Sequence, residues 1–231
     1  VVRLERFPEG TVGLHYIADC DDGERYFVTL YDGSRLAQIN ARKLDFTLPL
    51  TRTLYDSGLF TSLAPPLVTL QGELRGEFEG WPLVVCPYQE GNLLEDLPYQ
   101  AALQSQLARL VAGLHACTPH LNVDLPLREQ FSLPFEPALR KGLQMLEAIT
   151  SQDRWGRVAL RELLLPRRDS VLELLARTHA LEQAVRQAPP PFVLCHTDIH
   201  LANVLRTPQG RLVVVDWEGA CLAPAEHDLF I

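Results

Sequence analysis

The period of the hydrophobic pattern changes once along the 231 residues, and this change limits the folds that the chain can adopt. Before residue 87, short apolar runs alternate with turn clusters, a pattern typical of strands. After residue 92, apolar residues recur every three or four positions, which is typical of helices that face a core. The pattern predicts an α+β architecture in which a β-rich part precedes a mainly helical part.

The β-rich part is predicted to contain a hairpin, a helix and two further strands. Apolar residues at helical spacing place the helix over 44–55, with Pro49 near its first turn and Gly58 just after its end. The strand-like runs are residues 11–17 and 25–31, which form the hairpin, and residues 67–70 and 83–86.

The helical part is predicted to end in short strands. Its apolar stripes cover residues 103–114, 137–149, 158–165 and 171–185, and the strands cover 192–195, 204–206 and 211–215. Strand character stops near Pro87, so we predict an N-terminal lobe over 1–86, a hinge over 87–91 and a C-terminal lobe over 92–231. The chain stops inside an apolar stretch, and we expect it to lack the initiator methionine and further C-terminal helices.

Composition excludes several classes of partner. The net charge of −8 argues against a surface for nucleic acid or anionic membrane, which requires a basic face. No apolar run is long enough to cross a bilayer. The five cysteines form no CxxC pair and follow no signal-peptide pattern, so we expect reduced thiols in a cytoplasmic protein. The oligomeric state is left open.

Polar residues gather at the ends of two apolar strands near the C-terminus. His196-Thr197-Asp198 follows the strand 192–195, Asn203 comes five residues after Asp198, and Asp216 follows the strand 211–215. Carboxylate and amide oxygens that converge from strand ends are the ligands that Mg²⁺ prefers, with phosphates in the remaining positions. Phosphoryl transfer needs such a metal and a carboxylate near the attacking hydroxyl. The histidines and cysteines match no common zinc spacing.

The pattern H-x-D-x-x-x-x-N, followed by an apolar strand and an aspartate, resembles that of the aminoglycoside phosphotransferases and their choline kinase relatives. Residues 196–200, 215–218 and 222–229 are similar to those of the spectinomycin phosphotransferase type. This resemblance implies a bilobal protein-kinase-like fold with a β-rich N-lobe and a mainly helical C-lobe. It also implies transfer of the γ-phosphate of ATP or GTP, with Mg²⁺, to a hydroxyl of a small molecule.

The resemblance also assigns roles to residues. Asp198 would be the catalytic carboxylate, and His196 would brace the catalytic loop. Asn203 and Asp216 would hold Mg²⁺ against the nucleotide phosphates. The other implied roles are an adenine-binding hinge at Cys86, Pro87 and Tyr88, a structural Asp228, and a grip on a cationic substrate by Glu218 and Glu226.

The chain departs from the kinase pattern at the phosphate-binding lysine of the third strand. Thr29 occupies that position, and a hydroxyl cannot neutralise phosphate charge. The glycine loop, residues 9–13, has only Gly10 and Gly13 and matches neither nucleotide-loop motif. Either a nearby cation (Lys43, Arg42 or Arg35) substitutes for the lysine, or the chain is a catalytically impaired kinase-like binding protein.

Three hypotheses on function follow. An aminoglycoside or aminocyclitol kinase comes first, because the acidic chain suits a hydroxylated, cationic substrate. A metabolite kinase for an amino alcohol or sugar is the second, and a non-catalytic kinase-like protein is the third. The sequence does not distinguish ATP from GTP and does not identify the hydroxyl.

Overall fold

The computed structural model describes residues 1–8, 10, 12–122 and 127–229, and the chain forms two compact units. The first unit is made of residues 1–129 and 191–231, and the second of residues 130–190. Both predicted lobes contribute residues to the first unit. The unit boundaries therefore differ from the predicted lobe boundaries, which stay a prediction.

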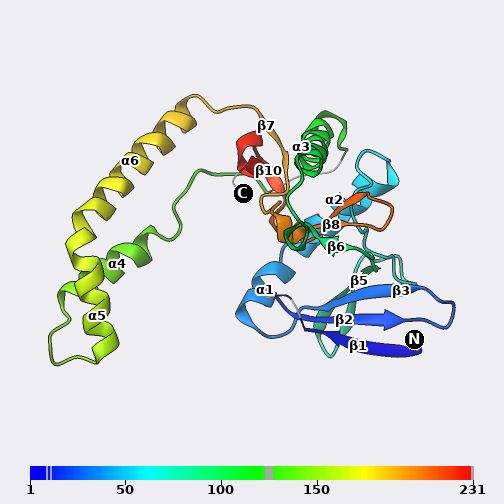
Figure 1. Cartoon of the computed structure of the whole chain (residues 1–231), viewed down its shortest axis with the longest axis horizontal. Helices are drawn as coiled ribbons and strands as arrows, with labels where there is room; N and C mark the ends of the chain where they lie inside the picture. Colours follow the sequence, from blue (N-terminus) through cyan, green and yellow to red (C-terminus); the bar gives the residue numbers. More distant parts are fainter. Residues whose placement is uncertain (9, 11, 123–126, 230–231) are drawn as a thin grey trace. The chain divides into compact units, whose positions relative to one another are not determined.

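A five-stranded antiparallel sheet with the order β1-β2-β3-β5-β4 occupies the N-terminal part of the first unit (Figure 1). Its strands are β1 Arg3–Phe7, β2 Leu14–Asp19, β3 Arg25–Leu30, β4 Gly76–Phe78 and β5 Trp81–Pro87. The predicted hairpin is confirmed as β2 and β3, apart from Thr11, which lies outside the described residues.

One predicted strand is wrong. Residues 67–70 form no strand, and Leu67 alone bonds to β5, through its N–H and the Val85 carbonyl at 2.8 Å. Val68 and Leu70 are exposed, so this apolar run gains little from burial against the sheet. The strand that pairs with β5 on the edge opposite β3 is instead β4. Sequence patterning missed both β1 and β4.

Two helices follow the third strand, α1 (Arg35–Ala41) and α2 (Leu44–Asp56). The apolar stripe of α2 is buried, and Gly58 after it has the left-handed φ of 71° that suits a glycine there. Pro49 lies inside α2 instead of in its first turn. The helix starts at Leu44, as predicted, and its first turn closes where the Phe46 and Thr47 N–H groups bond to the Lys43 carbonyl, so Pro49 lies beyond that turn.

The remaining elements of the first unit pack around one apolar core. It is centred on α3 (Ala101–Ala116), whose buried Leu107 and Leu114 share the core with residues of α2 and of the strands that follow β5. Those strands are β6 Asn92–Leu93, β7 Phe192–Cys195, β8 Val204–Arg206, β9 Leu212–Val214 and β10 Cys221–Pro224. They form a β6-β8-β9 sheet and a β7-β10 pair, and the three strands predicted there are confirmed.

Short 3-10 helices connect several of these elements. They cover Leu94–Asp96, Thr118–His120, Leu165–Arg167, Leu201–Asn203, Trp217–Gly219 and Ala225–Leu229. The last three follow strands β7, β9 and β10 and carry most of the polar residues singled out in the sequence.

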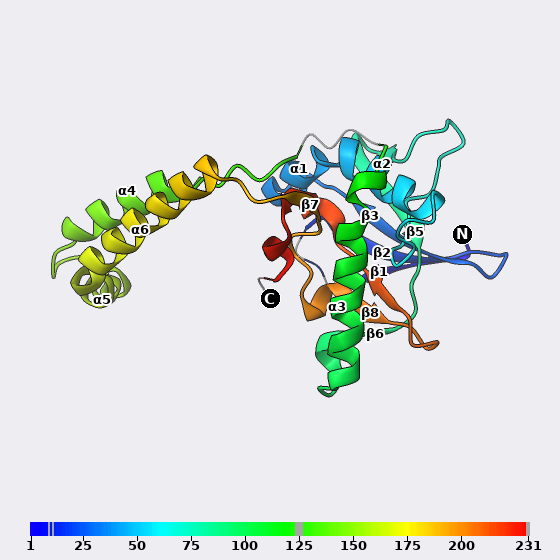
Figure 2. The same ribbon diagram turned by 90° about the horizontal axis from the view of Figure 1, so that it is seen from above.

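The second unit consists of the helices α4 (Glu136–Glu147), α5 (Trp155–Leu164) and α6 (Arg168–Gln187), as the apolar stripes predicted. Leu143 and Leu146 form the centre of its core. Figure 2 shows α4 and α6 side by side, joined by an ion pair of 2.8 Å between His179 Nε2 and Glu136 Oε2.

The five cysteines are free thiols. Among the described residues, none of the helices combines the length and apolar character that crossing a bilayer requires.

Candidate active site

His196 joins the turn after β7 to the end of β9. Its side chain is fully buried, and its Nε2–H donates to the Val215 carbonyl at 3.0 Å. The ring also meets the Trp217 indole edge-on at 4.9 Å. Burial lowers the pKa of His196, so the ring is neutral and serves as a hydrogen-bonding brace.

Thr197 has a left-handed backbone with φ of 72°, a conformation that costs a β-branched residue about 1–3 kcal/mol. Its N–H donates to Asp228 Oδ1 at 2.6 Å, and its hydroxyl donates to the Gly219 carbonyl at 2.9 Å. A Cβ at Gly219 would overlap this hydroxyl. The turn after β7 and the segment after Asp216 are therefore fitted to each other.

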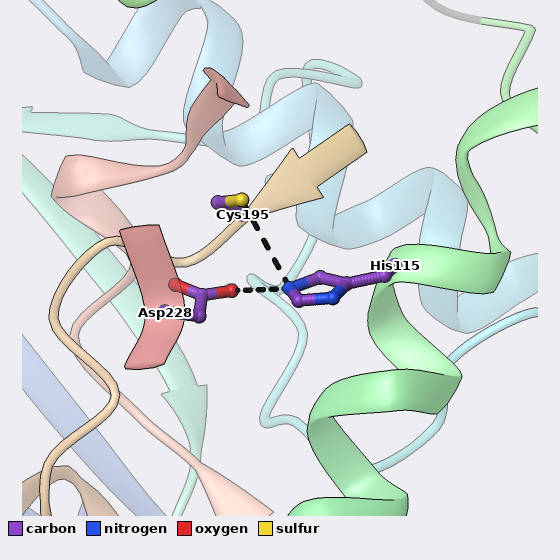
Figure 3. Close-up of side chains that lie close together, drawn as sticks. All are labelled: His115, Cys195 and Asp228. Carbon is purple, nitrogen blue, oxygen red and sulfur yellow. Dashed lines mark hydrogen bonds and ion pairs between the residues drawn. The ribbon is translucent and has the colours of Figure 1, made fainter. Parts of the chain in front are cut away.

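Asp228 anchors the same turn through hydrogen bonds to its backbone. Its buried Oδ2 accepts from the His196 N–H at 3.1 Å and from His115 Nε2 at 2.9 Å (Figure 3). Burial alone would raise the pKa of Asp228, but the hydrogen bonds from His115, Thr197 and His196 outweigh it and lower that pKa. The structural role predicted for Asp228 matches these contacts.

Cys195 completes a cluster with His115 and Asp228 whose spacing suits a metal ion (Figure 3). The cysteine Sγ lies 3.9 Å from His115 Nε2, but it donates to the Pro224 carbonyl at 3.3 Å. Burial raises the pKa of Cys195 to about 12, so the thiol keeps its proton. Without a metal ion, the three side chains form a hydrogen-bonded brace.

Asn203 and Asp198 are in direct contact. The Asn203 Nδ2 donates to the Asp198 carbonyl at 2.9 Å and to Asp198 Oδ2 at 3.0 Å. Asn203 is buried, whereas Asp198 is exposed and open to a substrate. His200, to which the sequence assigned no role, places Nε2 3.6 Å from Asp198 Oδ1. The Asn203 amide nitrogen thus orients the Asp198 carboxylate.

Asp216 lies beside a second acid, Glu218. A hydrogen bond with Glu218 is the main cause that raises the pKa of Asp216 to about 8, and burial and the charges of Glu218 and Asp198 add to it. Glu218 Oε1 accepts from the Tyr31 hydroxyl at 2.7 Å, while Oε2 is buried without a fixed donor in the described structure. Two acids that share one proton have the oxygen-rich, negative character that suits a divalent cation.

The hinge residues are bound to the third strand. Tyr88 donates its N–H to the Arg25 carbonyl at 2.9 Å, and the alternation of antiparallel pairing turns the Cys86 backbone toward β3 as well. The Pro87 carbonyl faces the other way and accepts from Gln89 Nε2 at 3.3 Å. Of these three residues, Pro87 alone directs a backbone polar group away from β3.

Thr29 lies on β3, as predicted, opposite His15 of β2. Its hydroxyl is hydrogen-bonded to His15 Nδ1 at 3.2 Å. In the glycine loop, Glu9 and Thr11 lie outside the described residues, whereas Gly10 and Gly13 both have positive φ. A Cβ at Gly10 would lie 2.5 Å from His15 Nε2, so the loop backbone packs directly on this ring.

Glu226 is exposed on the Ala225–Leu229 turn, and within the described structure no hydrogen bond or ion pair joins it to Asp198 or Asp216. The predicted residues therefore fall into three groups. One group contains Asp198, Asn203, Asp216 and Glu218, with His196 behind it; the second contains Thr29 and the hinge; Glu226 stands apart.

Sequence reasoning missed three residues that contact this site, Tyr31, His15 and His115. Tyr31 comes two positions after Thr29, which places both on one face of the extended chain, so a signal for it was present. His15 follows from the hairpin register once that register is known. His115 gave no signal, because 113 residues separate it from Asp228.

Comparison with known proteins decides the family. A model of the phosphotransferase enzyme family matches residues 3–231. The chain belongs to this family. No curated protein matches this phosphotransferase in sequence.

Solved structures resemble the phosphotransferase in fold. Spectinomycin phosphotransferase in complex with ADP and spectinomycin has 22% identity and a TM-score of 0.69, and the match covers 98% of this chain and 66% of that one. An aminoglycoside phosphotransferase from Alicyclobacillus acidocaldarius has 23% identity and a TM-score of 0.61, with 97% and 65% covered. A choline kinase from Streptococcus pneumoniae has 18% identity and a TM-score of 0.53, with 99% and 67% covered.

These similarities confirm the protein-kinase-like α+β fold. The phosphotransferase spans about two thirds of the length of the structures it resembles.

Proposed function

We propose that this phosphotransferase moves the γ-phosphate of ATP or GTP to a hydroxyl of a small, cationic molecule, with an aminoglycoside or aminocyclitol as the first candidate. The observation that carries the proposal is the contact of the Asn203 amide with the exposed Asp198, at 2.9 Å to its backbone carbonyl and 3.0 Å to its carboxylate, beside Asp216. Residues from two strand ends thus meet at one place, as phosphoryl transfer requires.

Asp198 is the proposed catalytic carboxylate. It is exposed, so a substrate hydroxyl can reach it, and the Asn203 amide fixes its orientation. The carboxylate would accept the hydroxyl proton as the oxygen attacks phosphorus. His196 supports this geometry from behind, through its bond to the Val215 carbonyl.

Asn203 and Asp216 are the proposed Mg²⁺ ligands. The fit rests on the buried Glu218 Oε2, which lacks a donor, and on the proton that Asp216 retains beside it. A bound Mg²⁺ would neutralise charge on the phosphate oxygens. The position of Glu218 between Asp216 and Tyr31 favours a place near this metal over the predicted contact with substrate.

The nucleotide would lie between the N-terminal lobe, residues 1–86, and the C-terminal lobe, residues 92–231, with its adenine at the hinge 87–91. The Pro87 carbonyl is the hinge group that faces away from β3 and is available to accept a hydrogen bond from a base. Cys86 and Tyr88 would contribute their side chains, because their backbones pair with β3.

The substrate class rests on charge. The net charge is −8, and Asp198 and Glu226 are both exposed acids. One of the solved structures with this fold is a spectinomycin phosphotransferase in complex with ADP and spectinomycin. An amino alcohol is the second candidate acceptor, because a choline kinase is among the structures with this fold.

Replacement of Asp198 with Asn tests the proposal. Asn has the same shape but cannot accept the hydroxyl proton, so we expect phosphate transfer to fall by about 10²–10⁴-fold. Transfer from ATP and GTP is measured over aminocyclitols, choline-like alcohols and sugars, and nucleotide binding is measured separately by calorimetry. Binding is expected to persist in D198N. Turnover by D198N at the wild-type rate would end the assignment.

A further inference from the structure

The position of the usual phosphate-binding lysine is taken by an uncharged pair. Thr29 bonds to His15 Nδ1 at 3.2 Å, and the His15 ring stacks on Phe27 with centroids 5.4 Å apart. Burial lowers the pKa of His15, which keeps the ring neutral. Gly10 packs over the other ring nitrogen and both side chains are half-buried, so the neutral pair brings no positive charge to the site.

The acidic cluster next to this pair is short of cations. Asp198, Asp216 and Glu218 lie close enough for their charges to act on one another. Within the described residues, Asp216 and Glu218 form no ion pair, and Asp198 has only His200, at 3.6 Å. A bound nucleoside triphosphate adds more negative charge. Without a nearby basic side chain, a metal ion alone would have to balance that charge.

Lys43 is placed to supply the missing charge. It directly precedes α2, and α2 packs against the Trp217–Gly219 segment. The Lys43 main chain is fixed, because its N–H donates to the Asn40 carbonyl at 2.8 Å and its carbonyl accepts from Phe46. Its side chain is half-buried and forms no ion pair or hydrogen bond within the described part of the chain.

The electrostatics agree with this placement. Leu44, the residue after Lys43, belongs to the same buried cluster as Tyr31, which donates to Glu218 at 2.7 Å, and the positive charge of Lys43 opposes the rise in the pKa of Cys221. Arg35 and Arg42, the other cations near this position in the sequence, are both exposed. Lys43 is thus the half-buried cation of the three.

We propose that Lys43 replaces the lysine missing from β3 and binds the phosphate groups of the nucleotide through its ammonium. This inference rests on the proposed function, since it assumes that a nucleotide occupies the site. In the kinase pattern the cation comes from the third strand; here it would come from the start of the helix that packs on the metal-binding segment. The chain would then be an active kinase despite Thr29.

A nucleotide series tests the role of Lys43. The variant Lys43→Met keeps the apolar stem and removes the charge, and Arg42→Met is the matched control at the adjacent exposed position. Affinities for adenosine, AMP, ADP and ATP, and for the guanosine series, are measured by calorimetry with Mg²⁺. We expect K43M to weaken ADP or ATP binding by about ten- to a hundredfold, with adenosine unchanged and R42M like wild type.

The outcomes separate the two proposals. If wild type binds ATP or GTP and K43M binds it equally tightly, the Lys43 inference is wrong and the proposed function stands. Equal losses for adenosine and ATP in K43M would show a structural role, and would also overturn the inference. If wild type binds no nucleotide at millimolar concentration, the proposed function fails first.

Discussion

Removal of the Asp228 carboxylate should destabilise the first unit strongly. Asp228 is 1% exposed and accepts from two backbone N–H groups, those of His196 and Thr197, and from His115 Nε2. The variant Asp228→Ala leaves these donors buried without an acceptor, at about 1–3 kcal/mol each. The His115 ring can change tautomer, so we count the two backbone groups fully and expect a loss of about 4 kcal/mol.

Thermal and urea unfolding measure this loss. A loss of that size lowers the melting temperature by roughly 10 °C in a chain of this length. Asp228→Asn retains one acceptor oxygen and should fall between wild type and D228A. Glu226→Ala, an exposed acid two positions away, is the control and should change the unfolding free energy by less than about 0.5 kcal/mol.

Hydrogen exchange locates the effect. The amide protons of His196 and Thr197 should exchange much faster in D228A than in E226A, because their acceptor is gone. If D228A unfolds within about 1 kcal/mol of E226A, then the three hydrogen bonds do not hold the turn, and the reasoning fails.

Two further predictions concern local geometry and pH. Gly219→Ala should cost about 1–3 kcal/mol, because its Cβ overlaps the Thr197 hydroxyl; Thr197→Gly should recover part of that loss, and additive losses in a double-mutant cycle would contradict the contact. A hydrogen bond that His179 donates to Glu182, together with the charge of Glu136, raises the pKa of His179. Stability of the second unit should therefore be full below the ordinary histidine pKa and fall as pH rises through the raised one; a His179→Gln variant lacks this dependence, and an NMR titration showing no upward pKa shift would refute it.

The sequence predicted the elements that have strong patterns. The strands 192–195 and 204–206 have the predicted bounds, and the stripe over 103–114 is the buried face of α3. These segments are apolar at a regular period and are bounded by turn residues, so local pattern and tertiary burial agree. The family motif also singled out Asp198, Asn203 and Asp216, whose catalytic and metal-binding roles stay predictions.

Other features depend on contacts between distant residues. Residues 67–70 have the composition of a strand, but it is β4 that pairs with β5. The bond between Tyr31 and Glu218 joins positions 187 residues apart, and no local pattern encodes it. The division at residues 130 and 190 was also missed, because a helical stripe does not reveal which core it enters.

The segment that leads into the second unit and the strand β7 that follows this unit lie on the two edges of β10. Leu222 of β10 bonds to Leu127 and Glu129 on one edge, and lies opposite Leu194 of β7 on the other. The Arg128 guanidinium lies 4.3 Å from the Phe192 ring centroid, so the segment that enters the second unit also contacts the strand that follows it. The three-helix segment therefore leaves and re-enters the first unit at adjoining points, so a change in its length does not require a change in the register of β7 and β10.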